Sequence, residues 1–184
     1  MLRQLIDDLR VRGPRERSSS EVGDLLARRS QDWPGTSRLI FRSGGYTRTC
    51  AYRDARFELL LLNWAPGAAS EIHDHGNQHC WMLVLDGRLA VDDYVRLDAG
   101  DLGGYAHVEA RGSQVLGAGA MDLRSGRYDL HRVSATPDAP AISLHVYAGP
   151  LREFLVYDEA ARRCKAARGT YDEVLSVYTE AAHR

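Results

Sequence analysis

The sequence predicts an all-β fold with a small helical cap at its N-terminus, built as a single domain of 184 residues. Two observations support this prediction. From residue 36 onward, short runs rich in Val, Ile, Leu, Tyr and Trp recur between Gly, Pro, Asp and Asn, a spacing typical of a β-sandwich or barrel. Before residue 33, apolar residues recur with a helical period instead. We therefore expect a helical cap at 1–32, a β core at 36–157 and a C-terminal extension at 158–184.

The cap is expected to contain two short helices. The first carries one apolar stripe at helical spacing, formed by Leu2, Leu5, Ile6 and Leu9. It should end before Gly13-Pro14. The second should begin after Ser18, because Glu21 lies three residues further on and completes a capping-box pattern.

The β core is expected to contain strands at 38–42, 46–52, 56–64, 79–85, 88–96, 127–133 and 141–147. Asp86-Gly87, between two of these runs, predicts a tight hairpin turn because such turns need residues that tolerate positive φ. The Gly- and Ala-rich stretch 98–126 gives no clear period. Near the end of the chain, Val174, Leu175 and Val177 fit either a late strand or a terminal helix.

Charge and composition argue against several classes of protein. Lys and Arg number 24 against 25 Asp and Glu, so nothing indicates nucleic-acid binding. The longest apolar runs are far shorter than the roughly 20 residues of a membrane span, and Asp7 and Asp8 argue against a signal peptide. Three cysteines at unrelated spacings form neither a disulfide framework nor a CxxC zinc motif. We expect a cytoplasmic monomer that acts on small molecules and binds neither nucleic acid nor membrane.

Two histidines separated by one residue form the clearest chemical motif. On a strand, His73 and His75 share one face while Asp74 points to the other. Adjacent buried imidazoles need partners for their ring nitrogens, and a divalent metal ion is such a partner. Taken alone, the pair fits two exposed loop histidines equally well.

The residues around this pair resemble the first motif of the cupin superfamily, in which HxH is followed by Glu and then by Gly at set intervals. Here Cys80 stands in place of the Glu, and Gly87 follows after six intervening residues. His131, within the run DLHRV, stands where a second cupin motif supplies a third histidine. The chain therefore resembles a cupin, whose fold is a jelly-roll β-barrel.

Four segments together narrow the resemblance to the cysteine dioxygenase type I family. They are the runs at 46–48, 72–81, 130–133 and 141–147, and the similarity extends over about residues 38–157. It implies a mononuclear Fe(II) bound by His73, His75 and His131. It also implies that the substrates are L-cysteine and O2, and that the product is cysteine sulfinic acid. Imidazole ligands alone do not select iron over zinc or copper.

Arg48 and Tyr46 are the candidate substrate-binding residues. A guanidinium offers a planar, permanently charged fork that matches a carboxylate, and Tyr46 lies two residues earlier on the same strand face. The register of this segment with the family pattern favours a role for Arg48 in binding the substrate carboxylate. The alternative is a solvated surface arginine.

Ser143, His145 and Tyr147 alternate along one face of a predicted strand and are candidate catalytic residues. Unpaired burial would cost about 1–3 kcal/mol for each of them, so they either form a hydrogen-bonded chain or face water. As a chain, Ser143 orients His145, which orients the Tyr147 hydroxyl toward the substrate and oxygen. The alternative is an edge strand with one wet face.

Cys80 is also a candidate site residue. The resemblance implies a thioether crosslink between Cys80 and Tyr147, formed autocatalytically in family members that carry both residues. Two alternatives remain: a thiolate metal ligand in the cupin Glu position, and a small buried core cysteine.

Three other functions compete with cysteine dioxygenase. Dioxygenases of 3-mercaptopropionate resemble this chain but usually carry Gln at the Arg48 position and lack a counterpart of Cys80. A non-catalytic cupin that binds a metal or small ligand would not need Ser143, His145 and Tyr147 beside the three histidines. A zinc-type cupin isomerase would need the Glu ligand that Cys80 replaces.

Overall fold

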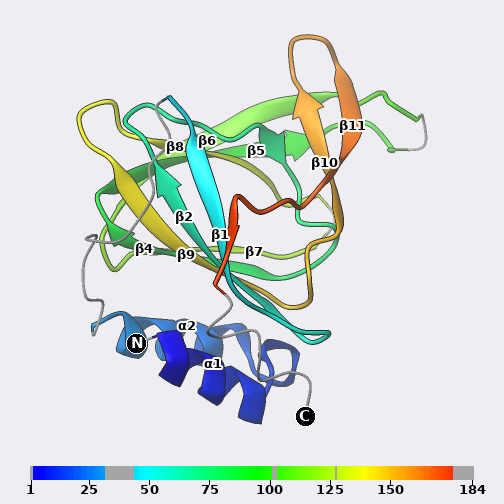
Figure 1. Cartoon of the computed structure of the whole chain (residues 1–184). Helices are drawn as coiled ribbons and strands as arrows, with labels where there is room; N and C mark the ends of the chain where they lie inside the picture. Colours follow the sequence, from blue (N-terminus) through cyan, green and yellow to red (C-terminus); the bar gives the residue numbers. More distant parts are fainter. Residues whose placement is uncertain (1, 32–43, 101–102, 127, 176–184) are drawn as a thin grey trace.

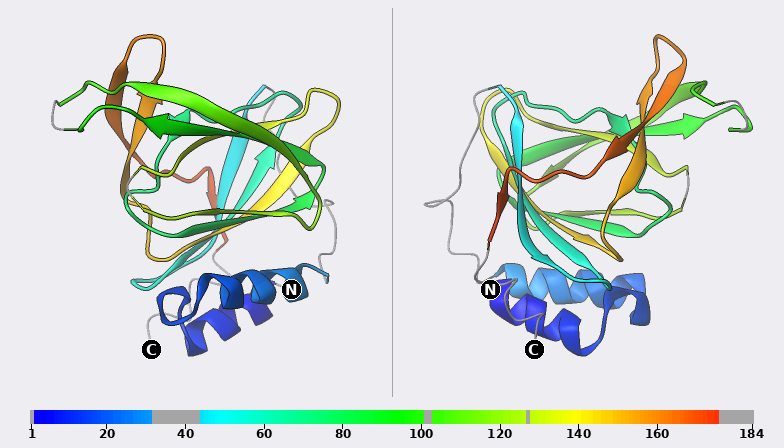
Figure 2. Two further views of the ribbon diagram at one scale, coloured as in Figure 1. Left: turned by 180° about the vertical axis from the view of Figure 1, so that it is seen from behind. Right: turned by 45° about the vertical axis from the view of Figure 1, so that its right-hand side comes forward.

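The computed structural model describes residues 2–31, 44–100, 103–126 and 128–175. Within these residues the chain forms two facing β-sheets with a pair of helices packed beneath one of them (Figures 1 and 2). The mostly β architecture and the small N-terminal helical cap confirm the predicted fold class. None of the described helices combines the length and apolar composition needed to cross a bilayer.

The helical cap consists of α1 (Leu2–Val11), a 3-10 turn (Pro14–Glu16) and α2 (Ser19–Ser30). The predicted capping box is confirmed, because the Ser18 hydroxyl accepts from the Glu21 amide and the Glu21 carboxylate accepts from the Ser18 amide. The apolar faces of both helices are buried against the outer face of one sheet, in a cluster that includes Leu5, Leu9, Val22, Leu26, Leu59, Leu61, Trp81 and Leu144. This burial stabilises the two short helices, which alone would be marginal in water.

Six strands form each sheet in the described part of the chain. The first sheet contains, in spatial order, β12 (Glu173–Val174), β1 (Tyr46–Arg53), β2 (Glu58–Trp64), β9 (Ala141–Tyr147), β4 (Cys80–Asp86) and β7 (Met121–Arg124). The second contains β11 (Arg163–Arg168), β10 (Glu153–Asp158), β3 (Ile72–His73), β8 (Leu130–Ala135), β5 (Arg88–Arg96) and β6 (Val108–Gly117).

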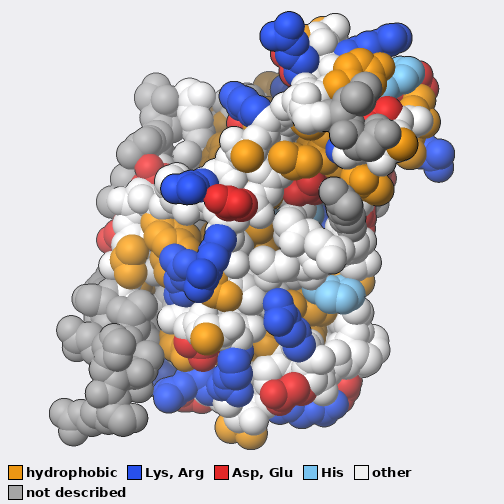
Figure 3. All heavy atoms as spheres, turned by 90° about the vertical axis from the view of Figure 1, so that its right-hand side faces the viewer, with side chains coloured by type: hydrophobic (Ala, Val, Ile, Leu, Met, Phe, Trp, Pro, Cys, Tyr) orange, Lys and Arg blue, Asp and Glu red, His pale blue; other side chains and the backbone are white. Residues whose placement is uncertain are grey.

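Consecutive strands mostly alternate between the two sheets, which gives the jelly-roll arrangement expected of a cupin. Their inner faces meet in one core, which includes Leu60, Leu62, Trp64, Met82, Leu89, Val91 and Val133. On the face seen in Figure 3, Lys and Arg side chains lie interspersed with Asp and Glu, in keeping with the balanced net charge of −1.

Most of the predicted strands are confirmed within a few residues: 46–52, 56–64, 79–85, 88–96, 127–133 and 141–147 correspond to β1, β2, β4, β5, β8 and β9. The predicted strand at 38–42 lies outside the described residues. The unassigned stretch 98–126 contains β6 and β7. Val174 belongs to the late strand β12, which pairs in parallel with β1, whereas Val177 lies outside the described residues.

The predicted hairpin at Asp86-Gly87 is wrong. β4 and β5 follow one another in sequence but lie in different sheets, so this turn is a corner where the chain crosses from one sheet to the other. Gly87 has φ +72°, and a Cβ there would lie 2.3 Å from the Pro140 carbonyl oxygen. The position therefore requires glycine for a close backbone approach between two chain segments.

Candidate metal centre

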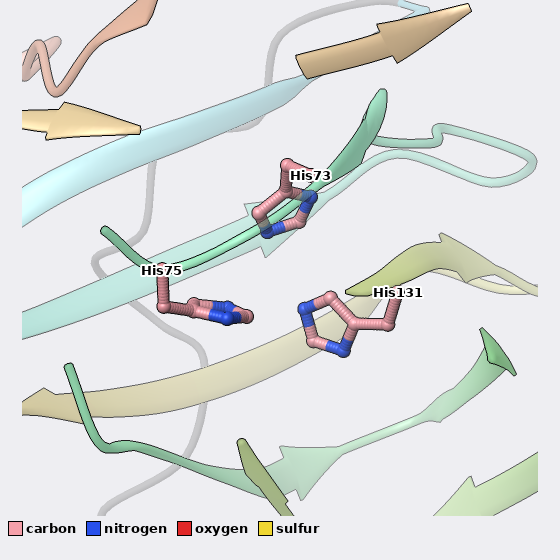
Figure 4. A group of neighbouring side chains, drawn as sticks. All are labelled: His73, His75 and His131. Carbon is pink, nitrogen blue, oxygen red and sulfur yellow. The ribbon is translucent and has the colours of Figure 1, made fainter. Parts of the chain in front are cut away.

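Three histidine side chains converge between the two sheets, as Figure 4 shows. His73 and His131 are directly paired neighbours on β3 and β8, and His75 lies two residues beyond the end of β3. One ligand atom from each lies within 4.8 Å of the others, and the ring centroids are 4.7–5.1 Å apart. The expectation that both members of the HxH pair share a strand face needs correction, because β3 ends at His73.

The loop after β3, rather than strand alternation, brings His75 to the same point as His73. Asp74 is buried and fixes this loop, because its carboxylate accepts hydrogen bonds from the Gly76 and Leu155 amides and from the Tyr157 hydroxyl. Gly76 has φ +59° and lies so close to the Glu153 carbonyl that a Cβ would reach 2.5 Å from its oxygen. Asp74 thus points away from the three imidazoles and holds the turn between two of them.

The ring nitrogens of the three histidines fit a divalent metal ion. Nδ1 of His73 lies 2.8 Å from the Glu71 carbonyl oxygen, and Nδ1 of His131 lies 3.0 Å from Oδ2 of Asp122. Because both acceptors need an N–H donor, each Nε2 keeps a free lone pair. Nδ1 of His75 is buried and makes no hydrogen bond in the described part of the chain. A metal ion bound between the three rings would provide a partner for the free nitrogens of His73, His75 and His131 together.

Burial also favours the protonation state that a metal requires. Burial lowers the pKa of His73. For His75 and His131, burial and the neighbouring imidazoles together hold the pKa values well below their usual range. The three rings are therefore neutral at pH 7, the form in which imidazole binds metals.

A buried ion-pair network orients His131, and sequence reasoning missed it. Asp122 on β7 accepts from His131 through Oδ2 and from Arg124 through both oxygens, each Arg124 contact being 2.7 Å. Arg124 also pairs with Asp93 at 2.6 Å and with Asp129 at 3.1 Å. A carboxylate behind a ligating histidine fixes its tautomer and ring orientation. One sequence signal could have indicated this network: Asp122 and Arg124 alternate with apolar residues in the run MDLR. That run lies within the stretch 98–126, which showed no clear period.

Next to the histidines, a small cavity brings together Tyr46, Arg48, His73 and Tyr147. Its volume is about 50 Å³. Nε and Nη2 of Arg48 are buried and make no hydrogen bond within the described residues. The Tyr46 ring stacks on Trp64 at 4.5 Å, and its hydroxyl interacts with Arg48. Two buried guanidinium nitrogens without hydrogen-bond partners are costly, so this arrangement fits an anionic ligand better than a solvated surface arginine.

Ser143, His145 and Tyr147 lie on β9, which is a central strand and is buried along its whole length. The alternative of an edge strand with a wet face is therefore wrong. Trp64 Nε1 donates to the Ser143 hydroxyl at 2.9 Å, and that hydroxyl lies 2.8 Å from Nε2 of His145. Burial lowers the pKa of His145 to about 3, so this ring is neutral at pH 7.

The chain of contacts continues from His145 to Cys80 rather than to the Tyr147 hydroxyl. Nδ1 of His145 lies 4.0 Å from the Cys80 sulfur, and the rings of His145 and Tyr147 stack with centroids 6.2 Å apart. Because the buried Ser143 hydroxyl needs an acceptor, it donates to Nε2, which leaves the His145 proton on Nδ1 and directed at the sulfur. The sequence did not predict that Trp64 belongs to this series of hydrogen bonds.

Cys80 on β4 lies directly opposite Tyr147 on β9 and is 1% exposed. Burial raises the pKa values of the Cys80 thiol and the Tyr147 hydroxyl, and the two side chains interact with each other. Among the described residues, the potential metal-binding group contains His73, His75 and His131 without Cys80. The sulfur therefore faces the tyrosine side of the site and not the histidine centre.

A double-sheet jelly-roll with three converging neutral imidazoles defines a protein of the cupin class whose histidine cluster fits a metal ion. Comparison with known proteins refines this assignment. The model of the cysteine dioxygenase type I family matches residues 15–160, and the chain belongs to this family of oxidoreductases.

The chain is similar to cysteine dioxygenase type 1 from Danio rerio, with 29% identity over 143 residues that cover 77% of this chain and 69% of that protein. It is also 29% identical over 116 residues to cysteine dioxygenase type 1 from Homo sapiens. That match covers 62% of this chain and 56% of the human protein, so the similar segment spans little more than half of the human protein.

Solved structures with a similar fold include a conserved protein with a double-stranded β-helix domain from Klebsiella pneumoniae, with a TM-score of 0.49 and 15% identity. That match covers 68% of this chain and 93% of the other. A cupin superfamily protein from Desulfitobacterium hafniense gives a TM-score of 0.45 at 11% identity and covers 62% of this chain and 93% of the other.

Proposed function

We propose that this protein is an Fe(II)-dependent thiol dioxygenase that oxidises L-cysteine with O2 to cysteine sulfinic acid. The observation that carries the proposal is the placement of Arg48, whose unpaired buried nitrogens border the same small cavity as His73. A thiol plus one O2 gives a sulfinic acid with both oxygen atoms on sulfur, so the reaction balances without an external reductant.

His73, His75 and His131 would hold the iron. When bound, a ferrous ion would favour the thiolate form of the substrate and supply the redox chemistry for its reaction with O2. Three neutral imidazoles contribute no charge of their own, so the full positive charge of the ion acts on the substrate. Asp122 and Arg124 keep His131 in the tautomer that directs Nε2 to the centre.

Arg48 and Tyr46 would bind the substrate carboxylate. The free nitrogens of the guanidinium match the two oxygens of a carboxylate, and their burial strengthens each charge-assisted hydrogen bond. The Tyr46 hydroxyl lies beside the same guanidinium. With the carboxylate held there, the thiol of a short amino acid would extend toward His73, which lines the same cavity.

Tyr147 would act on the reacting atoms, because its side chain lines the cavity that holds Arg48 and His73. Burial raises its pKa well above the usual range, so the hydroxyl stays protonated at neutral pH and can donate a hydrogen bond to the substrate or oxygen. Ser143 and His145 would position it indirectly, through the contact of His145 with Cys80 and the stacking of the two rings.

We also infer a thioether between Cys80 and Tyr147. Their direct opposition on neighbouring strands supports it. A carbon–sulfur bond would form with loss of the thiol hydrogen and one ring hydrogen, and O2 would accept the two electrons. The intact mass of the iron- and oxygen-treated protein should fall by two hydrogens, and Cys80→Ala should abolish that loss.

A dioxygenase of 3-mercaptopropionate is the second candidate, because that thiol also carries a carboxylate that Arg48 could bind. A non-catalytic metal-binding cupin is the third. Oxygen uptake by the iron-loaded protein with cysteine, 3-mercaptopropionate and cysteamine, together with metal analysis, separates the three. Fastest turnover of cysteine supports the proposal, preference for 3-mercaptopropionate supports the second candidate, and no uptake with any thiol supports the third. The monomeric state and the cytoplasmic location remain predictions.

Arg48→Ala tests the carboxylate contact directly. Each charge-assisted hydrogen bond contributes about 1.5–3 kcal/mol, so the KM for cysteine should rise by roughly one to two orders of magnitude. Arg88→Ala is the matched control, because Arg88 is exposed and pairs with the exposed Asp138 at 3.3 Å. An unchanged KM in Arg48→Ala would remove this residue from the site.

A further inference from the structure

The segment from Gly169 to Leu175, which we name the C-terminal strap, runs along the outer edge of β1 (Figure 1). The Asp172 amide donates to the Arg48 carbonyl oxygen at 2.8 Å, and Oδ2 of Asp172 accepts from the Arg48 amide at 2.8 Å. Further along, the Leu175 amide donates to the Cys50 carbonyl oxygen at 2.9 Å. The strap therefore holds the backbone of Arg48 from both of its polar groups.

One strap side chain reaches a buried acid on the neighbouring strand. The Tyr171 hydroxyl donates to Oε2 of Glu58 at 2.7 Å, and Glu58, on β2, is fully buried. Arg53 lies over the Tyr171 ring, 5.7 Å from its centroid, and its Nε is 3.7 Å from the same Glu58 oxygen. Without this hydroxyl, the buried Glu58 carboxylate would lose a hydrogen-bond donor, which is energetically costly. The contact therefore attaches the strap firmly to β2.

The strap also lies against the guanidinium of Arg48. A Cβ at Gly169 would be 3.9 Å from Nη2 of Arg48 and 2.3 Å from the carbonyl oxygen of Leu151, a residue that lines the small cavity. The backbone at Gly169 is therefore packed between the cavity wall and the arginine. This packing helps explain why two guanidinium nitrogens are buried without hydrogen-bond partners.

We propose that Tyr171 and Glu58 are positioning residues for the Arg48 guanidinium. Their hydrogen bond fastens the C-terminal strap over Arg48, which excludes water from the guanidinium and keeps it directed into the cavity. A charge-assisted hydrogen bond is stronger where water is excluded, so the strap increases the affinity for thiols that carry a carboxylate. This inference rests on the proposed function of Arg48 as the carboxylate-binding residue.

A labelling experiment tests the strap without metal or turnover. Metal-free protein is treated with phenylglyoxal, and modification of Arg48 is measured by peptide mass spectrometry relative to the exposed Arg88. Tyr171→Phe should raise the relative rate at Arg48 by about tenfold, the factor that corresponds to one lost hydrogen bond to a charged group. Tyr94→Phe, which removes a hydroxyl on the other sheet, should leave the rate unchanged. An unaltered rate in Tyr171→Phe would overturn the proposal.

Glu58→Gln provides a second variant, which carries the test if Tyr171→Phe fails to fold. The amide oxygen still accepts from Tyr171 but without a full charge, so we expect labelling of Arg48 to increase by a smaller factor, about two- to threefold. Labelling equal to that of the original protein would contradict the role of the Glu58 carboxylate.

A substrate comparison then separates this inference from the proposed function. In Tyr171→Phe, the KM for cysteine should rise by about tenfold, whereas turnover of cysteamine, which has no carboxylate, and the iron content should stay unchanged. General structural damage would affect both thiols. An active original protein with an unchanged KM for cysteine in Tyr171→Phe would refute the inference, whereas an original protein without activity toward any thiol would refute the proposed function alone.

Discussion

The contact between Asp122 and His131 allows a quantitative test of the metal centre through the substitution Asp122→Asn. Oδ2 of Asp122 accepts from Nδ1 of His131 at 3.0 Å and from Arg124 at 2.7 Å, and Oδ1 accepts from Arg124 at 2.7 Å. An asparagine keeps one oxygen acceptor and adds an NH2 donor. That donor would face either the Arg124 guanidinium or the His131 N–H, and both of these groups are donors too.

The expected loss follows from this conflict. If the amide nitrogen faces His131, the ring is driven to the tautomer with its proton on Nε2, the nitrogen needed for the metal. Substitution of a carboxylate behind a metal-binding histidine typically costs about 10- to 100-fold in metal affinity, equivalent to roughly 1.4–2.7 kcal/mol. We therefore expect Asp122→Asn to bind Fe(II), or Co(II) as a stable substitute, 10- to 100-fold more weakly.

An anaerobic competition titration against a chelator of known affinity measures this change. Asp129→Asn is the matched control, because Asp129 contacts the same Arg124 at 3.1 Å but touches none of the three histidines. Thermal unfolding of the metal-free variants shows whether each one remains folded. Equal metal affinity in a folded Asp122→Asn protein would show that this carboxylate does not orient His131.

Three further predictions address other parts of the molecule. In metal-free protein, acid should destabilise the fold below pH 6.5, because buried histidines such as His145, with a pKa of about 3, bind their protons only after unfolding; each such group costs roughly 1.4 kcal/mol per pH unit, and His145→Gln should reduce the slope of the urea-denaturation profile between pH 6.5 and 4 by about that amount, whereas an unchanged slope would contradict the neutral buried ring. Gly87→Ala should lower the free energy of unfolding by about 1–3 kcal/mol, because its Cβ meets the Pro140 carbonyl; an unchanged urea midpoint would argue against the sharp corner. Trp64→Phe should lower kcat several-fold at unchanged iron content by releasing Ser143, and full activity would exclude that hydrogen bond from catalysis.

Three of the strands that were predicted correctly share a clear cause. β2, β4 and β9 are buried and therefore rich in Leu, Val, Ile and Trp, which the sequence displays directly. β6 gave no such signal because it is an edge strand in which Glu109–Val115 are exposed. A strand with solvent on both faces needs no apolar alternation, so its sequence carries no period of two.

Strand pairing was less predictable than strand position. A Gly in a turn shows that the chain reverses or bends there, but it does not show which strands pair afterwards. At Asp86-Gly87 the turn was real, yet β4 pairs with β9 and β7 whereas β5 pairs with β8 and β6. In this jelly-roll several strands, such as β4 and β9, pair with strands from distant parts of the chain, and local turn chemistry does not encode these pairings.

The same limit applies to the site. His73 and His75 are close in sequence, so a short motif identifies them. Asp122, by contrast, contacts His131 nine positions further along the chain. Trp64 contacts Ser143, which is 79 positions away. No local pattern records such contacts. They exist because β7 faces β8 across the core and because β2 pairs with β9.

The two sheets contribute different parts of the site, and their separation therefore controls its chemistry. His73 and His131 belong to the second sheet, whereas Arg48, Cys80 and Tyr147 belong to the first. The distance between the nitrogens of the three-histidine cluster and the proposed carboxylate-binding guanidinium depends on the apolar side chains packed between the sheets. Because protein cores are close-packed, a change in the volume of one of these side chains shifts one half of the site relative to the other. Substitutions in the core, even far from any polar contact, should consequently change the distance between the positions that bind the thiol and the carboxylate of the substrate. No motif in the sequence specifies this distance.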